Sequence, residues 1–155
     1  MSTIHFKQST TLTPEQYVAG LTDFGPGRSE LFGNSADEDL KVHSESAHHA
    51  DVTEGSGGTW ERLEYDWSDP TRIVLKTTDS NTWGGASGYV YTLKRYDDDT
   101  TDIDAVIVRE GKNLKGRALA LVFKTLGRGV LPKAFAKTLK AIETRNAETR
   151  VAELV

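Results

Sequence analysis

The pattern of apolar and polar positions at the start of the chain predicts a strand followed by two short helices. Residues 4–8 alternate in polarity, as a half-buried strand does. Thr13 and Pro14 then open a helix, because threonine caps a helix start and proline suits the first helical position. The glycines and proline of residues 25–27 end this helix, and residues 28–32 predict a second, shorter one.

From residue 39 to residue 110 the pattern has the two-residue period of β-strands, interrupted by turn residues. The predicted strands span residues 40–46, 52–54, 60–67, 72–78, 87–96 and 101–110. The links between them are short, so we expect consecutive strands to pair in antiparallel fashion.

The last third of the chain, after Gly111, has a helical period and predicts one long helix. Its expected apolar stripe consists of Leu119, Val122, Phe123, Leu126, Leu131, Phe135, Leu139 and Ile142. Gly127, Gly129 and Pro132 fall within the stripe, so we expect a kink or a short break there. Residues 147–155 are expected to be a frayed end.

This order of elements predicts one α+β domain over residues 1–155. Only the final helix is long enough to cover a face of the sheet, so we expect an antiparallel sheet curled around it. A strongly twisted sheet touches one helix along a limited strip. The remaining concavity predicts a pocket for a small molecule between the sheet and the helix.

Strand alternation predicts which side chains face this pocket. The apolar positions set inward are Ile4, Phe6, Leu63, Tyr65, Trp67, Ile73, Leu75, Thr77, Tyr89, Tyr91, Leu93, Ile103, Ala105 and Ile107. The same parity brings Glu61, Asp79 and Arg109 inward, and a few polar groups in an apolar lining are typical of a selective pocket. A bulge would reverse such assignments, because a slip of one residue exchanges the two faces of a strand.

The composition is that of a soluble globular protein, with 37% hydrophobic and 27% charged residues among 155. No apolar run is long enough to span a bilayer, and the first residues lack the pattern of a signal peptide. These features predict a cytoplasmic protein without integral membrane association. The absence of cysteine excludes disulfides, thiolate metal sites and cysteine nucleophiles.

Charge is distributed unevenly along the chain. Residues 1–110 carry 9 Lys and Arg against 20 Asp and Glu, and residues 111–155 carry 10 against 3, so their net charges are −11 and +7. The basic helix could be a solvated face attracted to the acidic part of the domain. It could instead bind anionic lipid or a negatively charged partner. Nucleic acid is not expected, because the basic residues lack interleaved aromatic residues.

The order of elements over Thr3–Ala147 resembles the START-like, or SRPBCC, superfamily of helix-grip proteins (START/Bet v1-like). Four local stretches are similar to bacterial members described as polyketide cyclase/dehydrase or lipid transport proteins: Asp51–Gly55, Tyr65–Ser68, Thr78–Asn81 and Val108–Gly116. The resemblance implies a deep cavity between sheet and helix for a hydrophobic or aromatic ligand. The superfamily has no shared catalytic motif, so the resemblance implies no catalytic residue.

The candidate ligand-binding residues come from the inward face, the long helix and the polar segment 78–85. They are Tyr65, Trp67, Asp79, Asn81, Trp83, Tyr89, Tyr91, Arg109 and Phe123. The polar segment could be a plain turn or a pocket rim with Trp83 as a lid. Arg109 could pair with Glu61 or Asp79 as plain structure, or hold a carboxylate or phenolate of a ligand.

The histidines are the only other candidates for site chemistry. His43, His48 and His49 lie near Asp51, and histidine with carboxylate is a ligand set for zinc or iron. However, adjacent histidines on a strand face opposite ways, and no second cluster completes a coordination sphere. We therefore expect no metal and no cofactor, and a solvated loop or edge strand in this region.

Three functions are compatible with the sequence. The first is binding of a small hydrophobic or aromatic molecule, such as a lipid, a polyketide or a quinone-like compound. The alternative is an enzyme of cyclase/aromatase type, with Glu61, Asp79 and Tyr91 as acid–base candidates and Arg109 as an electrostatic stabiliser. The third is a protein-interaction or co-chaperone module that uses the basic helix. The protein could be a monomer or a homodimer.

Overall fold

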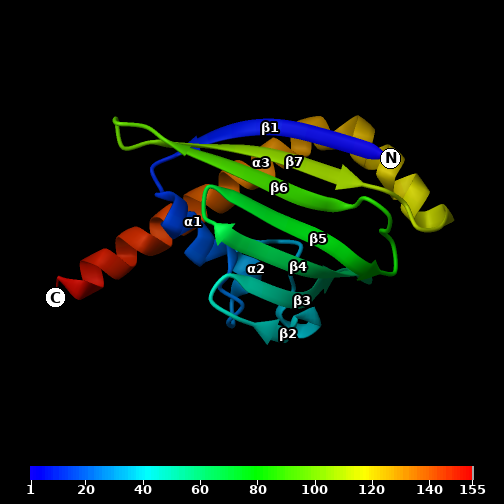
Figure 1. Ribbon diagram of the computed structural model, residues 1–155, viewed down its shortest axis with the longest axis horizontal. Coiled ribbons are helices and arrows are strands. Elements are labelled where there is room, and N and C mark those ends of the chain that lie inside the picture. Colours follow the sequence, from blue (N-terminus) through cyan, green and yellow to red (C-terminus); the bar gives the residue numbers. More distant parts are fainter. Residues whose placement is uncertain (155) are drawn as a thin grey trace.

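In the computed structural model, which describes residues 1–154, seven antiparallel strands form one sheet that curls around a long helix (Figure 1). The elements are β1 (Ser2–Thr10), α1 (Pro14–Leu21), α2 (Arg28–Leu31), the 3-10 helix η1 (Asp37–Asp39), β2 (Lys41–Glu45), β3 (His49–Ser56), β4 (Thr59–Asp69), β5 (Arg72–Ser80), β6 (Gly88–Arg95), β7 (Thr101–Arg109) and α3 (Leu114–Glu153). The predicted α+β helix-grip architecture is confirmed.

The sheet has the order β1-β7-β6-β5-β4-β3-β2. Strands β2 to β7 follow one another as hairpins, and β1 closes the far edge by pairing with β7 from Ser2↔Arg109 to Thr10↔Thr101. Gly57 and Gly58 form the tight turn between β3 and β4 with φ values of 60° and 83°, a region that favours glycine. The hairpin order places the inward residues of β3 to β7 on one continuous concave surface.

Helix α1 begins as the sequence predicts. The Thr13 hydroxyl accepts a hydrogen bond from the Gln16 backbone N–H at 3.1 Å, and the Gln16 side chain accepts one from the Thr13 N–H at 2.9 Å. This capping box satisfies two amides that the first turn leaves free. The helix buries Tyr17 and Leu21 in the core beneath the sheet.

Helix α3 is continuous from Leu114 to Glu153, so the short break expected near Pro132 is a wrong prediction, whereas the kink stays a prediction. Gly127 has a packing role instead. A Cβ on Gly127 would lie 2.5 Å from Ile4 Cδ1, so the missing side chain lets α3 approach β1 closely. Gln8 of β1 also donates to the Pro132 carbonyl at 3.2 Å. Residues 147–153, which were expected to fray, are helical, and residue 155 lies outside the described residues.

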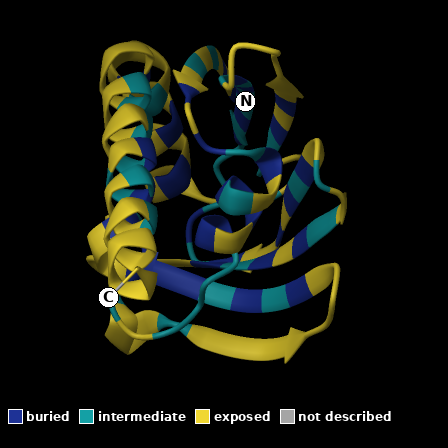
Figure 2. Cartoon of the chain, turned by 90° about the vertical axis from the view of Figure 1, so that its left-hand side faces the viewer, coloured by how far each residue is buried: buried dark blue, intermediate teal, exposed yellow. Residues whose placement is uncertain are grey.

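The apolar stripe predicted for α3 is only partly buried. Leu139 and Ile142 pack into the core as expected, but Leu119, Val122 and Leu126 are exposed. In this first half of the helix the buried positions are small residues: Gly116, Ala120 and Gly127. A helix with small residues at the contact can lie almost directly on the sheet, which turns its larger apolar side chains toward solvent. Figure 2 shows the resulting exposed outer side of α3.

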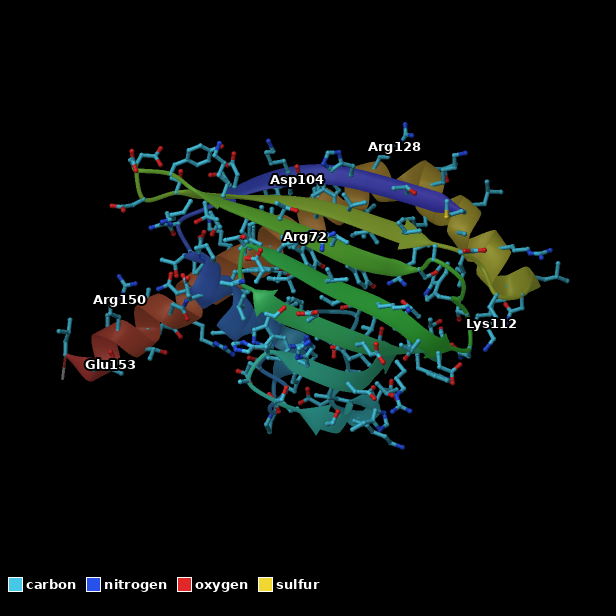
Figure 3. The ribbon with its side chains drawn as sticks, viewed as in Figure 1. Arg72, Asp104, Lys112, Arg128, Arg150 and Glu153 are labelled. Carbon is cyan, nitrogen blue, oxygen red and sulfur yellow. The ribbon has the colours of Figure 1, made fainter. Side chains whose placement is uncertain are left out.

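The surface carries the charge asymmetry that the sequence indicates. Figure 3 shows Arg128 and Arg150 on α3 and Asp104 on the sheet. Lys133, Lys137 and Lys140 of α3 are also exposed, and a partner surface there stays a prediction. Within residues 1–154 no helix is both long and apolar enough to cross a bilayer. The cytoplasmic location stays a prediction.

Candidate functional site

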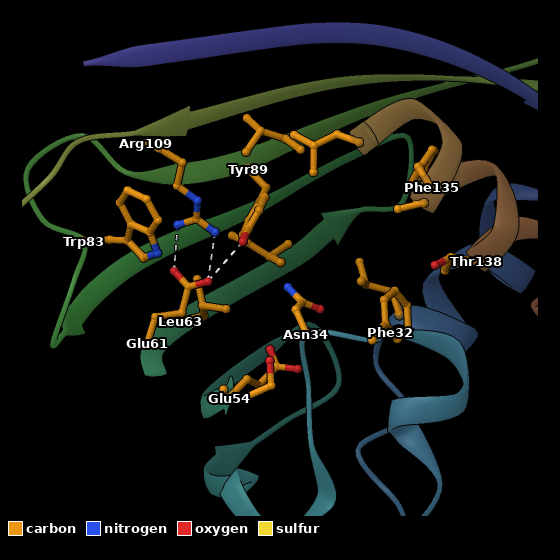
Figure 4. A pocket seen from close by; sticks show the side chains of 18 of the residues that line it. Phe32, Asn34, Glu54, Glu61, Leu63, Trp83, Tyr89, Arg109, Phe135 and Thr138 are labelled. Atoms are coloured by element: carbon orange, nitrogen blue, oxygen red, sulfur yellow. Dashed lines mark hydrogen bonds and ion pairs between the residues drawn. The ribbon is translucent and has the colours of Figure 1, made fainter. Parts of the chain in front are cut away.

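A cavity of about 450 Å³ lies between the concave face of the sheet and α3. This size is within the range of small-molecule pockets. Its apolar walls are formed by Phe6, Leu21, Phe32, Leu63, Leu75, Ile107, Phe123, Leu131, Ala134 and Phe135. Among the lining residues Gly33, Asn34 and Ala134 are exposed, so the cavity opens between the loop after α2 and the middle of α3. Figure 4 shows this region from close by.

Most of the residues expected to bind a ligand lie in this cavity. The expected residues in its lining are Tyr65, Trp83, Tyr89, Tyr91, Arg109 and Phe123, together with the acid–base candidate Glu61. Trp67, Asp79 and Asn81 are not among the lining residues. Trp67 packs against the core from a half-buried position near the end of β4.

Asp79 does not face the cavity, so its inward orientation is a wrong prediction. Strand β5 contains an irregularity: Leu63 pairs with Thr77, but the preceding Arg62 pairs with Asp79. The extra residue reverses the alternation beyond it. Asp79 is therefore on the outer face with its side chain 58% exposed, 3.5 Å from Lys112 Nζ. Ser80 takes the buried position instead.

Asn81 has a structural role in a turn. Its side-chain oxygen accepts a hydrogen bond from the Trp60 N–H at 3.1 Å, and its amide nitrogen donates to the Gly58 carbonyl at 2.7 Å. These bonds tie the segment after β5 to the β3–β4 hairpin. Of the two roles the sequence left open for the polar segment, Asn81 has the turn role, whereas Trp83 lines the cavity.

Arg109 and Glu61 form a buried ion pair at one end of the cavity (Figure 4). Arg109 Nη1 donates to Glu61 Oε2 and Nη2 to Oε1, both at 2.9 Å. The same carboxylate accepts from the Thr77 hydroxyl at 3.0 Å and from the Tyr89 hydroxyl at 3.0 Å. The guanidinium carbon lies 5.0 Å from the ring centroid of Trp83 and 4.5 Å from that of Tyr89. Of the two partners that the sequence left open for Arg109, the structure has Glu61.

The ion pair spans three strand spacings of the sheet. Glu61 is on β4 and Arg109 on β7, with β5 and β6 between them. Three steps across a flat sheet, at about 4.8 Å each, would separate these strands by about 14 Å. On the concave face, Glu61 instead reaches donors from all three following strands: Thr77 of β5, Tyr89 of β6 and Arg109 of β7. The group therefore links four adjacent strands across the concave face that lines the cavity.

A second buried pair, Arg28 with Glu54, was missed by the sequence reasoning. Arg28 Nε donates to Glu54 Oε1 at 2.8 Å, and the Ser35 hydroxyl donates to the same oxygen at 2.8 Å. The Tyr65 hydroxyl donates to Glu54 Oε2 and accepts from Arg28 Nη2 at 3.2 Å. A usable signal was present, because Glu54 shares the parity of Ala50 and Val52 on β3, both of which are buried.

The aromatic rings Phe24 and Phe32 complete the surroundings of Arg28. Their centroids lie 4.8 and 4.5 Å from its guanidinium carbon. Burial alone would lower the pKa of Arg28, but its interactions with Tyr65 and Glu54 outweigh this and raise the pKa. The arginine therefore keeps its charge and ties α2 to the sheet.

The two glutamates lie directly opposite each other, since Glu54 of β3 pairs with Glu61 of β4. Like charges in this position repel. Each carboxylate turns instead to its own arginine, Glu54 to Arg28 and Glu61 to Arg109. The four ionised groups thus cancel, and the cavity wall has no net formal charge.

Tyrosines are among the remaining polar groups of the wall, together with Asn34, Ser56, Thr59, Trp83 and Thr138. The rings of Tyr89, Tyr91 and Phe135 are nearly parallel, with centroids 6.4 and 5.8 Å apart. Burial raises the pKa of Tyr91 and, together with nearby Glu54, that of Tyr65, so both hydroxyls hold their protons. Within residues 1–154 the Tyr17 hydroxyl is buried without a hydrogen-bond partner, next to Tyr91.

The histidine region is a polar edge of the sheet. His43 is exposed on β2 and contacts the Thr53 hydroxyl at 2.7 Å, and His49 lies 3.5 Å from Asp66. Across residues 1–154 no group of three or more His, Cys, Asp or Glu side chains is arranged to hold a metal ion. This edge lies outside the cavity.

No protein-family model and no curated protein match the chain. Several solved structures share its fold. A protein from Thermus thermophilus has a TM-score of 0.69 and 11% identity, over 92% of this chain and 98% of its own. A START superfamily protein from Mycobacterium smegmatis has a TM-score of 0.66 and 9% identity, over 96% and 99%. An aromatase/cyclase from a Streptomyces species has a TM-score of 0.62 and 14% identity, over 96% and 94%.

Proposed function

Because the chain has the START-like helix-grip fold, we propose that it binds one small hydrophobic or aromatic molecule, such as a lipid, a polyketide or a quinone-like compound, between the sheet and α3. The observation that carries the proposal is the cavity itself. It has a volume of about 450 Å³, aromatic and aliphatic walls, and a mouth between Asn34 and Ala134. Burial of apolar ligand surface in such a site is the main source of affinity.

Titration with the neutral fluorophore N-phenyl-1-naphthylamine, whose emission rises in apolar surroundings, tests the proposal. We expect saturable binding of one molecule per chain. Ala134→Trp places a large ring at the mouth and should abolish binding, whereas Ala118→Trp, at an exposed α3 position outside the cavity lining, should not. Absence of binding to the wild-type protein, or equal binding to both variants, would remove the basis of the proposal.

A cyclase-type reaction is the second candidate, because one of the similar structures is an aromatase/cyclase. Of the three acid–base candidates, Asp79 is on the outer face and Glu61 is engaged by four donors, which leaves it poorly placed to take a proton. Tyr91 lines the cavity, and its protonated hydroxyl could donate a hydrogen bond that polarises a bound carbonyl group. If the protein turns over a polyketide-like substrate, Tyr91→Phe should reduce the rate while binding persists.

A further inference from the structure

The carboxylates of the cavity wall are already occupied by donors of the protein. Glu61 accepts four hydrogen bonds: two from Arg109, one from Thr77 and one from Tyr89. Two carboxylate oxygens offer about four lone-pair sites. Glu54 in turn accepts from Arg28, Ser35 and Tyr65. Glu61 therefore has no free lone-pair site, and both carboxylates are already compensated by an arginine, so a ligand cation would find no uncompensated negative charge.

The arginines are equally engaged. Both terminal nitrogens of Arg109 donate to Glu61, and Figure 4 shows its guanidinium between the rings of Trp83 and Tyr89. Arg28 donates to Glu54, to Tyr65 and to the Asp23 carbonyl at 2.8 Å, with aromatic rings beside it. Each guanidinium is already paired with a carboxylate, so a ligand anion would find no uncompensated positive charge in the wall.

The polar groups that remain available are neutral. Tyr91 and Trp83 line the cavity, and each carries a neutral donor group, a hydroxyl on Tyr91 and an indole N–H on Trp83. Both can donate to an oxygen of a ligand. Burial keeps the Tyr91 hydroxyl protonated by raising its pKa. The cavity wall thus has neutral hydrogen-bond donors, and its charged groups are paired with one another.

We propose that the cavity selects uncharged ligands, and that the polar contact of such a ligand is a neutral oxygen, as in a ketone, quinone or alcohol. The inference rests on the proposed function, since it names the ligand class of that same site. An ionised group that entered the cavity would lose its hydration without gaining a free counter-charge. That loss strongly disfavours binding. The Arg109–Glu61 and Arg28–Glu54 pairs therefore act as structural clamps and not as receptors for a charged ligand.

Two probes with the same ring system test this selectivity. N-phenyl-1-naphthylamine is neutral, and 8-anilinonaphthalene-1-sulfonate adds one anionic group. We expect the sulfonate to bind the cavity at least about tenfold more weakly than the neutral probe. Because the sulfonate can also adhere to the basic face of α3, only the fraction displaced by excess neutral probe is counted.

Glu61→Gln tests whether the ion pairs cause the selectivity. The substitution keeps the shape of the side chain and leaves Arg109 with an uncompensated charge in the wall, so the affinity for the sulfonate should rise relative to the neutral probe. Asp51→Asn is the matched control. It makes the same change of charge on the outer face of the sheet, where Asp51 pairs with Arg62 at 2.7 Å, and should leave the ratio unchanged. If circular dichroism shows that Glu61→Gln fails to fold, Glu54→Gln makes the same test at the other pair.

The outcomes separate the two proposals. Equal affinity of the wild-type protein for both probes overturns the inference and leaves the proposed function standing. An unchanged ratio in the folded glutamine variant also overturns it, because the ion pairs then play no part in the selectivity. Failure of both probes to bind contradicts the proposed function itself.

Discussion

Removal of one member of the Glu61–Arg109 pair should destabilise the fold far more than removal of both. Arg109→Met deletes the cation and keeps a long unbranched side chain. The relative exposure of the two side chains is only 11% for Glu61 and 7% for Arg109, so the remaining carboxylate would stay in the cavity wall with only Thr77 and Tyr89 as donors. Breaking a buried pair in this way costs about 3–5 kcal/mol.

The double variant Glu61→Gln/Arg109→Met has no buried charge at this site. Its glutamine oxygen can still accept from Tyr89 or Thr77, so we expect a total cost of about 1–2 kcal/mol. Arg109→Met alone should therefore cost about 1–4 kcal/mol more than the double variant, so the effects of the two substitutions are strongly non-additive.

Urea unfolding followed by far-ultraviolet circular dichroism measures these values. Fluorescence is the poorer signal, because the Trp83 ring lies 5.0 Å from the Arg109 guanidinium and would report the local change. Arg62→Met is the matched control: it breaks the Arg62–Asp51 pair on the outer face, and should have little effect because water screens that pair. If Arg109→Met costs no more than this control, the buried pair contributes no more to stability than the exposed one.

Three further predictions concern the cavity wall and the turn beside it. Tyr65→Phe should lower the free energy of unfolding, measured in urea, by about 1–3 kcal/mol, because the Tyr65 hydroxyl bonds two buried charged groups. Tyr17→Phe should be neutral or stabilising, because the Tyr17 hydroxyl has no hydrogen-bond partner within residues 1–154. The pKa values of Tyr17, Tyr65 and Tyr91 are raised, so the folded state holds these protons more tightly than the unfolded state, and stability should fall as the pH rises above the ordinary tyrosine range. Tyrosinate absorbance should then show these three ionising only as the protein unfolds, and earlier ionisation in the folded state would contradict their burial. Gly55→Ala should lower the free energy of unfolding by about 1–3 kcal/mol, since the new Cβ would lie 2.4 Å from the Thr59 carbonyl oxygen. Gly33→Ala is the control, because a Cβ at Gly33 would have no atom within 4 Å.

The element order was predictable because periodicity and turn residues report local structure. The capping box at Thr13 and the alternation of the strands were sufficient to place β1, α1 and the hairpins. The continuity of α3 was not predictable, because the effect of Gly127 depends on its contact with Ile4 of β1, far away in the sequence. Long-range packing decided between a break and a close approach.

The same distinction between local sequence patterns and long-range contacts applies to the site. Alternation brought Glu61 and Arg109 to the concave face, as the sequence predicts. It failed at Asp79, because a single extra residue in β5 reverses the strand beyond it and leaves no mark in the composition. The pairing of Arg28 with Glu54 could not be predicted for another reason. Arg28 lies in a four-residue helix, and only the fold brings it to Glu54.

A crystal structure of the protein with N-phenyl-1-naphthylamine tests the central claim most directly. The account predicts one probe molecule between the concave face of the sheet and α3, in contact with Tyr91 and Phe135, with both arginine–glutamate pairs intact. A probe bound only on the outer side of α3, with the cavity closed by side chains, would contradict it.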